Sequence, residues 1–154
     1  MANDYYNDDR RAYVNLRKSA SCAHKLDYHF VFATKYRKPV LEFSLAATLR
    51  DLILEICKER RILVLALSIQ PDHVHLILGL RPDDCPAEVA HDLKGKSPFK
   101  MIGEFPDLKD ALGSTKLWGA GYSVETLGKA NVAQIDTYLQ NQELHHLERE
   151  ISAD

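Results

Sequence analysis

The chain has 154 residues, of which 45% are hydrophobic and 27% charged, so its length and composition fit one globular domain with its own apolar core. These proportions exclude a disordered chain and a fibrous repeat. The longest apolar run, residues 62–67, is far too short to span a bilayer, and the polar, acidic first ten residues have no apolar segment typical of a secretory signal. We therefore expect a cytoplasmic protein that is not attached to a membrane.

The three cysteines, Cys22, Cys57 and Cys85, lie far apart and form no Cys-x-x-Cys pair. A disulfide-built miniprotein and a structural zinc site both need a denser pattern than this. We therefore expect three free thiols, as is typical of a cytosolic protein.

The formal net charge of −2 conceals a strong segregation of charge along the chain. Residues 10–40 contain eight lysines and arginines against a single acid, Asp27, and a second basic cluster comprises Lys94, Lys96 and Lys100. The acids concentrate near both ends of the chain. This pattern fits a basic face that binds a polyanion such as nucleic acid, although charged runs are also common on ordinary solvated surfaces.

The hydrophobic pattern predicts a short arm followed by alternating strands and helices. Residues 1–20 are expected to form a flexible N-terminal arm. Residues 26–34 are rich in aromatic and β-branched side chains, with Leu26, Tyr28, Phe30 and Phe32 on one face, and predict a strand. The apolar spacing of residues 45–59 predicts a helix capped by Ser44. The later predicted elements are strands at 62–70 and 73–80, a helix at 86–104 broken or kinked near Gly95 and Pro98, a loop-rich stretch at 106–121, a strand at 122–127 and a helix at 132–150.

This order of elements predicts an α+β fold, a ferredoxin-like βαββαβ sandwich with one additional C-terminal helix. Only Pro71 and Asp72 separate the second and third strands, so these two strands should form an antiparallel hairpin. The sheet would be antiparallel, with helices on one face and the other face available for a ligand. Because this architecture serves many functions, the fold alone does not identify the activity.

The third predicted strand begins with the segment Pro-Asp-His-Val-His-Leu, at residues 71–76. Alternate side chains of a strand share a face, so His73 and His75 should point the same way, while Val74 and Leu76 point into the core. Two neighbouring imidazoles can bind a divalent metal or a phosphate. A His-x-His pair is weak evidence by itself, since many such pairs are surface histidines or hydrogen-bonded partners.

The predicted C-terminal helix carries Tyr138 and Gln142, which are four residues apart and therefore share a helix face. They flank an apolar stripe of Val132, Ile135 and Leu139. Taken alone, this pattern fits a core tyrosine beside an amide better than it fits a functional site.

Several motifs together resemble the HUH-type single-tyrosine transposases of small insertion sequences, a family that includes relatives associated with repeated hairpins. They are the His-x-His strand, the Tyr-Leu-Gln-Asn-Gln helix and five intervening or preceding segments, at residues 28–29, 35–37, 93–96, 117–122 and 126–128. The resemblance extends over about residues 24–143, so it identifies residues 21–150 as a single HUH transposase catalytic domain whose C-terminal helix carries the tyrosine.

The resemblance implies a chemistry for four residues. His73, His75 and Gln142 would bind a divalent metal, Mg²⁺ or Mn²⁺, and Tyr138 would attack single-stranded DNA to give a 5′-phosphotyrosine. Three neutral ligands leave most of the metal's charge for the scissile phosphate. Mn²⁺ suits two imidazoles better than Mg²⁺ does, and the identity of the ion stays open. The covalent link conserves the phosphodiester's energy, which suits cleavage and rejoining of strands.

The resemblance also implies a homodimer that recognises DNA hairpins near the element ends. The tyrosine helix of one subunit can complete the other subunit's site, and residues 128–131 are the expected hinge for that exchange. A DNA-binding role is expected for the basic and aromatic residues of two segments. Each cation fits a solvated surface side chain about as well, and the tyrosine fits a cap on the core equally well. These residues are Lys35, Tyr36, Arg37, Lys38, Lys94, Lys96 and Lys100.

Three other functions compete with transposition. A domesticated HUH endonuclease that acts on repeated hairpins would carry the same four residues. A non-catalytic, ferredoxin-like nucleic-acid-binding module would use strand aromatics for stacking but gives no reason for the two motifs to occur together. A histidine-triad nucleotide hydrolase needs a third histidine where this chain has Ile77.

Overall fold

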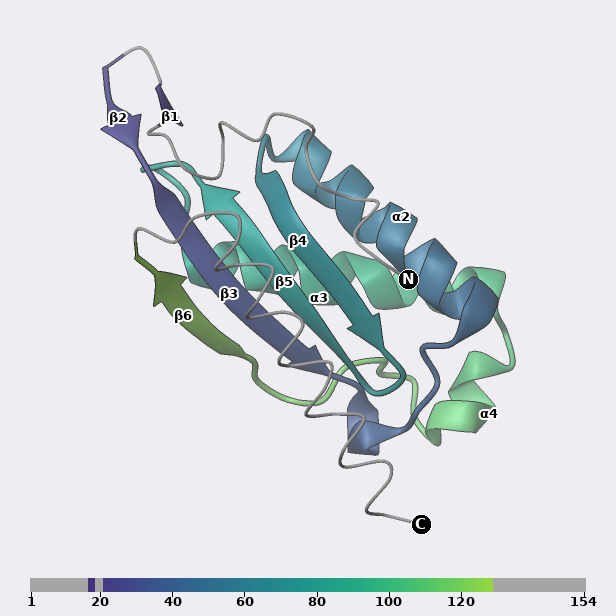
Figure 1. Cartoon of the computed structure of the whole chain (residues 1–154). Coiled ribbons are helices and arrows are strands. Elements are labelled where there is room, and N and C mark those ends of the chain that lie inside the picture. Colours follow the sequence, from purple (N-terminus) through teal and green to yellow (C-terminus); the bar gives the residue numbers. More distant parts are fainter. Residues whose placement is uncertain (1–16, 19–20, 129–154) are drawn as a thin grey trace.

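The computed structural model describes residues 17–18 and 21–128 of the chain (Figure 1). The predicted helix at 132–150 and nearly all of the predicted arm lie outside the described residues. In chain order the elements are β1 (Arg17–Lys18), β2 (Ala23–His24), β3 (Leu26–Ala33), the 3₁₀ turn η1 (Lys35–Arg37), α2 (Phe43–Glu59), β4 (Leu63–Gln70), β5 (His73–Leu80), α3 (Pro86–Glu104), α4 (Leu108–Leu112) and β6 (Ser123–Leu127).

The main sheet has four strands in the order β4-β5-β3-β6, and every neighbouring pair is antiparallel. The longest pairing joins β3 to β5 along eight residues, from Leu26 opposite Leu80 to Ala33 opposite His73. β6 pairs with the free edge of β3, and β4 forms the predicted hairpin with β5. This arrangement confirms the predicted α+β fold of the ferredoxin-like type, with an antiparallel sheet.

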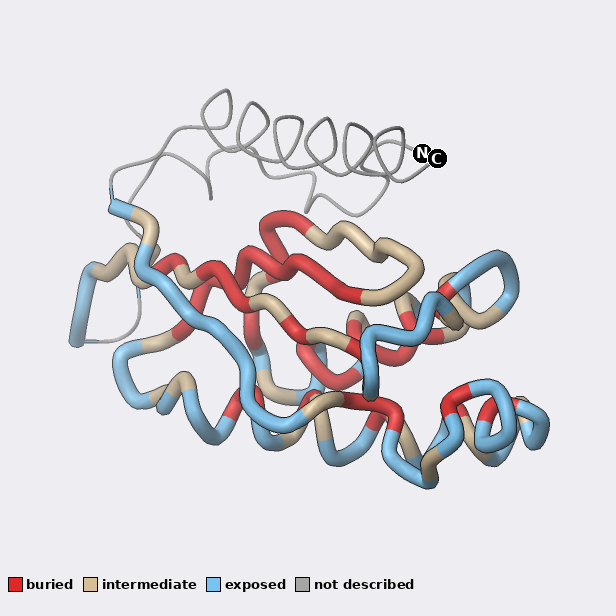
Figure 2. The backbone as a smooth tube through the Cα atoms, turned by 90° about the horizontal axis from the view of Figure 1, so that it is seen from below, coloured by how far each residue is buried: buried red, intermediate tan, exposed pale blue. Residues whose placement is uncertain are grey.

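One face of the sheet packs against α2 and α3 and forms the apolar core (Figures 1 and 2). Alternation along the two central strands supplies this face with Phe30 and Phe32 from β3 and with Val74, Leu76 and Leu78 from β5, all of them essentially without solvent exposure. The amphipathic helices contribute the opposing side chains, which are listed here by helix: Leu49, Leu52, Ile53 and Ile56 from α2, and Val89, Ala90, Leu93 and Met101 from α3.

The helices differ from the prediction at three points. α2 begins at Phe43 rather than after a Ser44 cap, because the extended Glu42 accepts the first backbone hydrogen bonds through its carbonyl. α3 continues unbroken through Pro98, although this proline lacks an N–H donor and its ring crowds the carbonyl of Lys94. The stretch expected to be loop-rich contains the short helix α4. Among the described residues, no helix has the length and apolar character that crossing a membrane requires.

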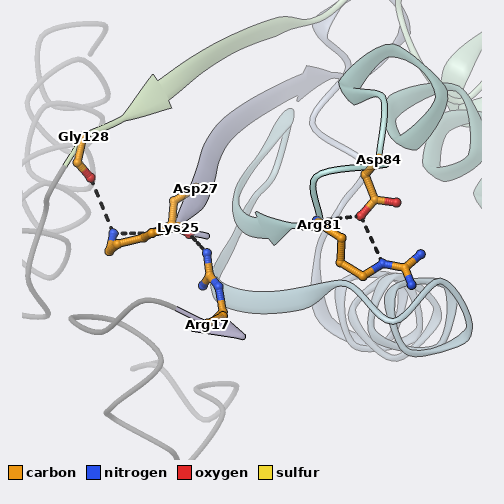
Figure 3. Close-up of polar contacts among 6 residues, drawn as sticks. All are labelled: Arg17, Lys25, Asp27, Arg81, Asp84 and Gly128. Carbon is orange, nitrogen blue, oxygen red and sulfur yellow. Dashed lines mark hydrogen bonds and ion pairs between the residues drawn. The ribbon is translucent and has the colours of Figure 1, made fainter. Parts of the chain in front are cut away.

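The short pair β1–β2 was not indicated by the sequence, and it places Arg17 over the second face of the sheet. Asp27 is buried on β3, where its carboxylate forms ion pairs with Arg17 and, at 2.5 Å, with Lys25 (Figure 3). Gly79 lies opposite Asp27 on β5, and a Cβ there would come within 2.6 Å of the Arg17 guanidinium. The glycine therefore makes room for the close approach of the arginine. Lys25 also donates to the carbonyl of Gly128, 3.4 Å away, just beyond β6.

We predict that the three thiols differ sharply in reactivity. Cys22 and Cys85 are exposed, whereas Cys57 is buried in α2 and burial raises the pKa of its thiol to about 12, against a weaker opposing effect of Arg60. Because the thiolate is the reactive species, Cys57 should react about a thousandfold more slowly than an ordinary thiol at pH 8. Titration with a chromogenic disulfide should count two thiols in the native protein and three after denaturation; three equally fast thiols would contradict this packing.

Candidate functional site

The His-x-His pair lies at the start of β5, on the face of the sheet opposite α2 and α3. The rings of His73 and His75 are edge to face, with centroids 4.9 Å apart, while Val74 and Leu76 point into the core. The alternation predicted from the sequence therefore holds. This face was expected to be available for a ligand, but both side chains are almost fully buried: His73 is 3% exposed and His75 is 6% exposed.

A carboxylate fixes the proton on His73. The Nδ1 of this ring is 2.6 Å from Oδ1 of Asp72, whose other oxygen is 3.2 Å from Nε of Arg37. Burial alone would raise the pKa of the Asp72 carboxyl, but the hydrogen bond with His73 and the Arg37 charge outweigh burial and lower that pKa. An ionised carboxylate can only accept, so His73 donates through Nδ1 and would bind a metal through Nε2.

A third histidine, His29, joins the pair from the neighbouring strand β3. Its Nε2 lies 3.0 Å from Nδ1 of His75, and the two rings are stacked with centroids 5.2 Å apart and planes inclined by 19°. Burial lowers the pKa of His29, and the carboxylate of Glu125 on β6 opposes this only in part. The sequence offered two signals for this residue: it belongs to a segment that contributes to the family resemblance, and it lies on the strand face opposite Phe30 and Phe32.

His73 and His75 fit part of the ligand set of a metal site. Both His73 and His75 have Nδ1 engaged by a neighbour, so each would bind a metal through Nε2, as imidazole ligands with outer-sphere partners do. Within residues 17–18 and 21–128, no group of three or more His, Cys, Asp and Glu side chains is placed to hold a metal ion. The described residues therefore offer two ligands, and a complete site needs further ones. Tyr138 and Gln142, the two site residues predicted on the C-terminal helix, lie outside the described residues.

The first group of predicted DNA-binding residues forms the turn η1, beside the histidine pair. Tyr36 and Arg37 have left-handed backbone conformations, with φ of 57° and 53°, and Tyr36 is 67% exposed. The ammonium of Lys35 lies 5.2 Å from the centre of the Tyr36 ring. Lys38 is exposed at the end of this turn, and its carbonyl accepts a hydrogen bond from the Thr34 hydroxyl at 2.8 Å. The turn thus presents an aromatic ring and several cations at the end of β3 where His73 lies.

Lys94, from the second predicted group, organises a loop. Its ammonium donates to the carbonyls of Gly119 and Gly121, at 3.0 and 2.5 Å, and partial burial lowers its pKa. Lys94, Lys35 and Lys116 also line a hollow of about 290 Å³ next to this loop. The sequence analysis did not single out Lys116.

The other two predicted lysines of α3 are paired with acids. Lys96 lies 3.8 Å from Asp92 on the same helix, and Lys100 lies 3.2 Å from Glu55 on α2. Surface pairs of this kind are weak, so they leave both ammonium groups able to contact a phosphate. A DNA-binding role for the two lysines stays a prediction.

Trp118 fixes the loop that precedes β6 against the core. Its ring packs edge to face on Phe32 at 5.7 Å, and its indole N–H donates to the buried Ser97 hydroxyl at 2.8 Å. Ser97 in turn donates to the carbonyl of Leu93, one turn earlier in α3. The Leu-Trp-Gly segment noted in the sequence is therefore a structural joint between α3 and the end of β3.

Comparison with known proteins places this chain in a class, the transposases. Residues 22–142 match the family described as "Transposase IS200 like". The chain is 31% identical over 129 residues to the ISDra2 transposase TnpA of Deinococcus radiodurans, an alignment that covers 84% of this chain and 92% of that protein. It is also 31% identical over 115 residues to the transposase for insertion sequence element IS200 of Salmonella typhimurium, with 75% of each chain covered. The chain belongs to the IS200-like transposase family.

Two solved structures support the same fold. A crystal structure of a protein from Deinococcus radiodurans assigned as a transposase superposes with a TM-score of 0.69 and 36% identity, over 82% of this chain and 98% of that one. The structure of a REP-associated tyrosine transposase bound to a REP hairpin superposes with a TM-score of 0.50 and 18% identity, over 73% and 63% of the two chains. The second likeness concerns the fold alone.

We predict that Lys94→Met loosens the loop before β6. The substitution removes two charge-assisted hydrogen bonds to the carbonyls of Gly119 and Gly121, each of the kind that contributes roughly 1.5–3 kcal/mol. The backbone amides of Gly119 and Lys35, which join this loop to the end of β3, should then exchange with solvent at least about tenfold faster. Lys96→Met on the same helix is the matched control, and equal exchange rates in both variants would contradict the role of Lys94.

Proposed function

We propose that this transposase cleaves and rejoins single-stranded DNA with a divalent metal and Tyr138 as the nucleophile. The observation that carries the proposal is the arrangement of His73 and His75, which share one face of β5 and each have Nδ1 engaged by a neighbouring side chain. Family membership supplies the DNA-cleaving context for that pair. Gln142 is the third proposed protein ligand.

In this proposal the metal, Mg²⁺ or Mn²⁺, supplies positive charge to the scissile phosphate when bound. The Tyr138 oxygen attacks phosphorus and forms the new P–O bond, while the bond to the 3′ oxygen breaks and that oxygen takes up a proton. The products are a 5′-phosphotyrosine and a free 3′-OH. A phenol has an ordinary pKa of about 10, so the tyrosine must lose its proton to an acceptor or to solvent as attack proceeds. Attack by another 3′-OH reverses the step and joins strands without ATP.

The proposed substrate is single-stranded DNA with hairpins near the ends of an insertion sequence. The exposed ring of Tyr36 and the cations of η1 lie at the same end of β3 as His73, which favours a strand running across this edge. The hollow lined by Lys35, Lys94 and Lys116 adds two further lysines next to Lys35 of η1. The structural neighbour described with a REP hairpin is consistent with hairpin recognition by this chain.

We predict that purified protein forms a metal-dependent covalent adduct with labelled single-stranded DNA containing the gene's flanking hairpins. On a denaturing gel a slow band should survive SDS, require Mg²⁺ or Mn²⁺, and disappear in Tyr138→Phe because the phenylalanine ring has no nucleophilic oxygen. His75→Ala should lower adduct formation by at least about a hundredfold, since it removes a proposed metal ligand.

The matched control is Tyr36→Phe, which removes the same hydroxyl from an exposed tyrosine next to the histidine pair. It should keep the adduct at close to the parent level, because phenylalanine retains the aromatic ring that is proposed to contact DNA. An adduct that persists in Tyr138→Phe but is lost in Tyr36→Phe would reassign the nucleophile. Retardation on a native gel without any adduct would leave a DNA-binding module and overturn the catalytic proposal.

We also propose a homodimer in which the tyrosine helix of one subunit completes the site of the other, with residues 128–131 as the hinge. A mixture of the His73→Ala and Tyr138→Phe variants tests this exchange. Each variant alone is inactive, but in a mixed dimer with exchanged helices the intact histidine pair meets an intact Tyr138. With equal amounts and random mixing, half of the dimers are mixed and each has one intact site, so about a quarter of the parent adduct should return, attached to the His73→Ala chain. No restoration, with subunit mixing verified, would contradict exchange.

A further inference from the structure

We propose that His29 is a positioning residue that holds His75 in the tautomer and orientation needed to bind the metal. This inference rests on the proposed function, because it assigns a supporting role to a residue behind one of the proposed ligands. The segment 28–29 contributes to the family resemblance, but that resemblance assigns no role to His29. The contact that carries the assignment is the 3.0 Å approach of His29 Nε2 to His75 Nδ1.

The register of the sheet brings the two rings together. His29 pairs directly with Ile77 across the β3–β5 ladder, and His75 lies two residues from Ile77 on the same face. Diagonal neighbours of this kind are far apart at the backbone but within reach for aromatic side chains. The stacked rings, 5.2 Å apart, span that diagonal. His29 is 3% exposed, so the contact is made away from solvent.

The proton between the two rings decides whether His75 can act as a ligand. If Nδ1 of His75 carries the proton and donates to Nε2 of His29, then Nε2 of His75 holds a lone pair for a metal. In the opposite arrangement His29 donates, the proton of neutral His75 lies on Nε2, and that nitrogen cannot coordinate. We therefore assign the first arrangement, with His29 as the acceptor and its own proton on Nδ1.

His73 provides an internal precedent for this assignment. Its Nδ1 is held at 2.6 Å by the Asp72 carboxylate, a partner that can only accept. The two proposed ligands therefore have equivalent supports from different strands and of different chemistry, a carboxylate for His73 and an imidazole for His75. Such outer-sphere partners fix the orientation of a metal-binding imidazole and typically contribute 10- to 100-fold in metal affinity or activity.

The test uses two substitutions that differ by a single methylene group. In His29→Gln the side-chain oxygen reaches the position of the original Nε2 and can still accept from His75. In His29→Asn the amide ends at the position of Nδ1 and falls short. Both variants keep a polar amide at the buried position, so a comparison between them separates the hydrogen bond from general effects of the substitution. His91→Gln, on an exposed position of α3, controls for loss of a histidine elsewhere.

The first measurement is the tautomer of His75 in the metal-free, full-length protein at pH 7.5, from long-range ¹H–¹⁵N spectra of ¹⁵N-histidine-labelled samples. The parent and His29→Gln should carry the His75 proton on Nδ1, and His29→Asn should shift it toward Nε2. The second measurement is Mn²⁺ affinity by electron paramagnetic resonance, with His75→Ala defining binding outside the site. We expect Kd to rise by about 10- to 100-fold in His29→Asn and by less than about threefold in His29→Gln and His91→Gln.

Two results overturn the positioning role while leaving the proposed function intact. One is a parent protein whose metal-free His75 carries its proton on Nε2, and the other is a folded His29→Asn variant that binds Mn²⁺ as tightly as the parent does. A parent that binds no Mn²⁺ at the pair and forms no DNA adduct overturns the proposed function itself, and the role of His29 with it. Circular dichroism of each variant verifies that the fold is retained.

Discussion

The antiparallel pairing of β3 with β5 is the constraint on which the rest of the molecule depends. It joins the two central strands along eight residues, and its register decides which side chains face α2 and α3. Because the side-chain period of a strand is two, a slip of one residue would move Phe30 and Phe32 out of the core and turn His29 into it. The apolar core therefore fixes the register, and the register in turn brings His29 to His75.

The surroundings of the histidine pair depend on the same two strands. Asp72 lies in the turn between β4 and β5, directly before His73, and its carboxylate contacts the His73 ring. Arg37, in the turn after β3, forms an ion pair with the same carboxylate. Trp118 anchors the loop before β6 through its contacts with Phe32 and Ser97. Lys94, on α3, donates hydrogen bonds to backbone carbonyls of the same loop. Hydrogen bonds and side-chain packing therefore fix the positively charged edge of the sheet beside the histidine pair.

Much of the fold was predictable because its signals are local. Aromatic alternation in β3, helical spacing in α2 and the two-residue turn between β4 and β5 each depend on neighbours in the chain, and these elements appear where the sequence predicts them. The errors arose where tertiary packing overrides local preference. Pro98 lies inside a continuous α3, whose next turns are held by the burial of Met101. β1 has two residues and no pattern of its own; its pairing depends on contacts such as that between Arg17 and Asp27.

The sequence by itself determined the architecture, the family resemblance and the shared face of His73 and His75, because strand alternation is a property of adjacent residues. It did not separate cations directed at a ligand from cations paired within the protein, such as Lys94 with the loop carbonyls or Arg37 with Asp72. Only the tertiary structure decided these partners and the contact between His29 and His75. That contact joins residues 46 positions apart in the chain. Its geometry depends on sheet register and on the reach of two rings across a diagonal, neither of which is encoded in any local pattern.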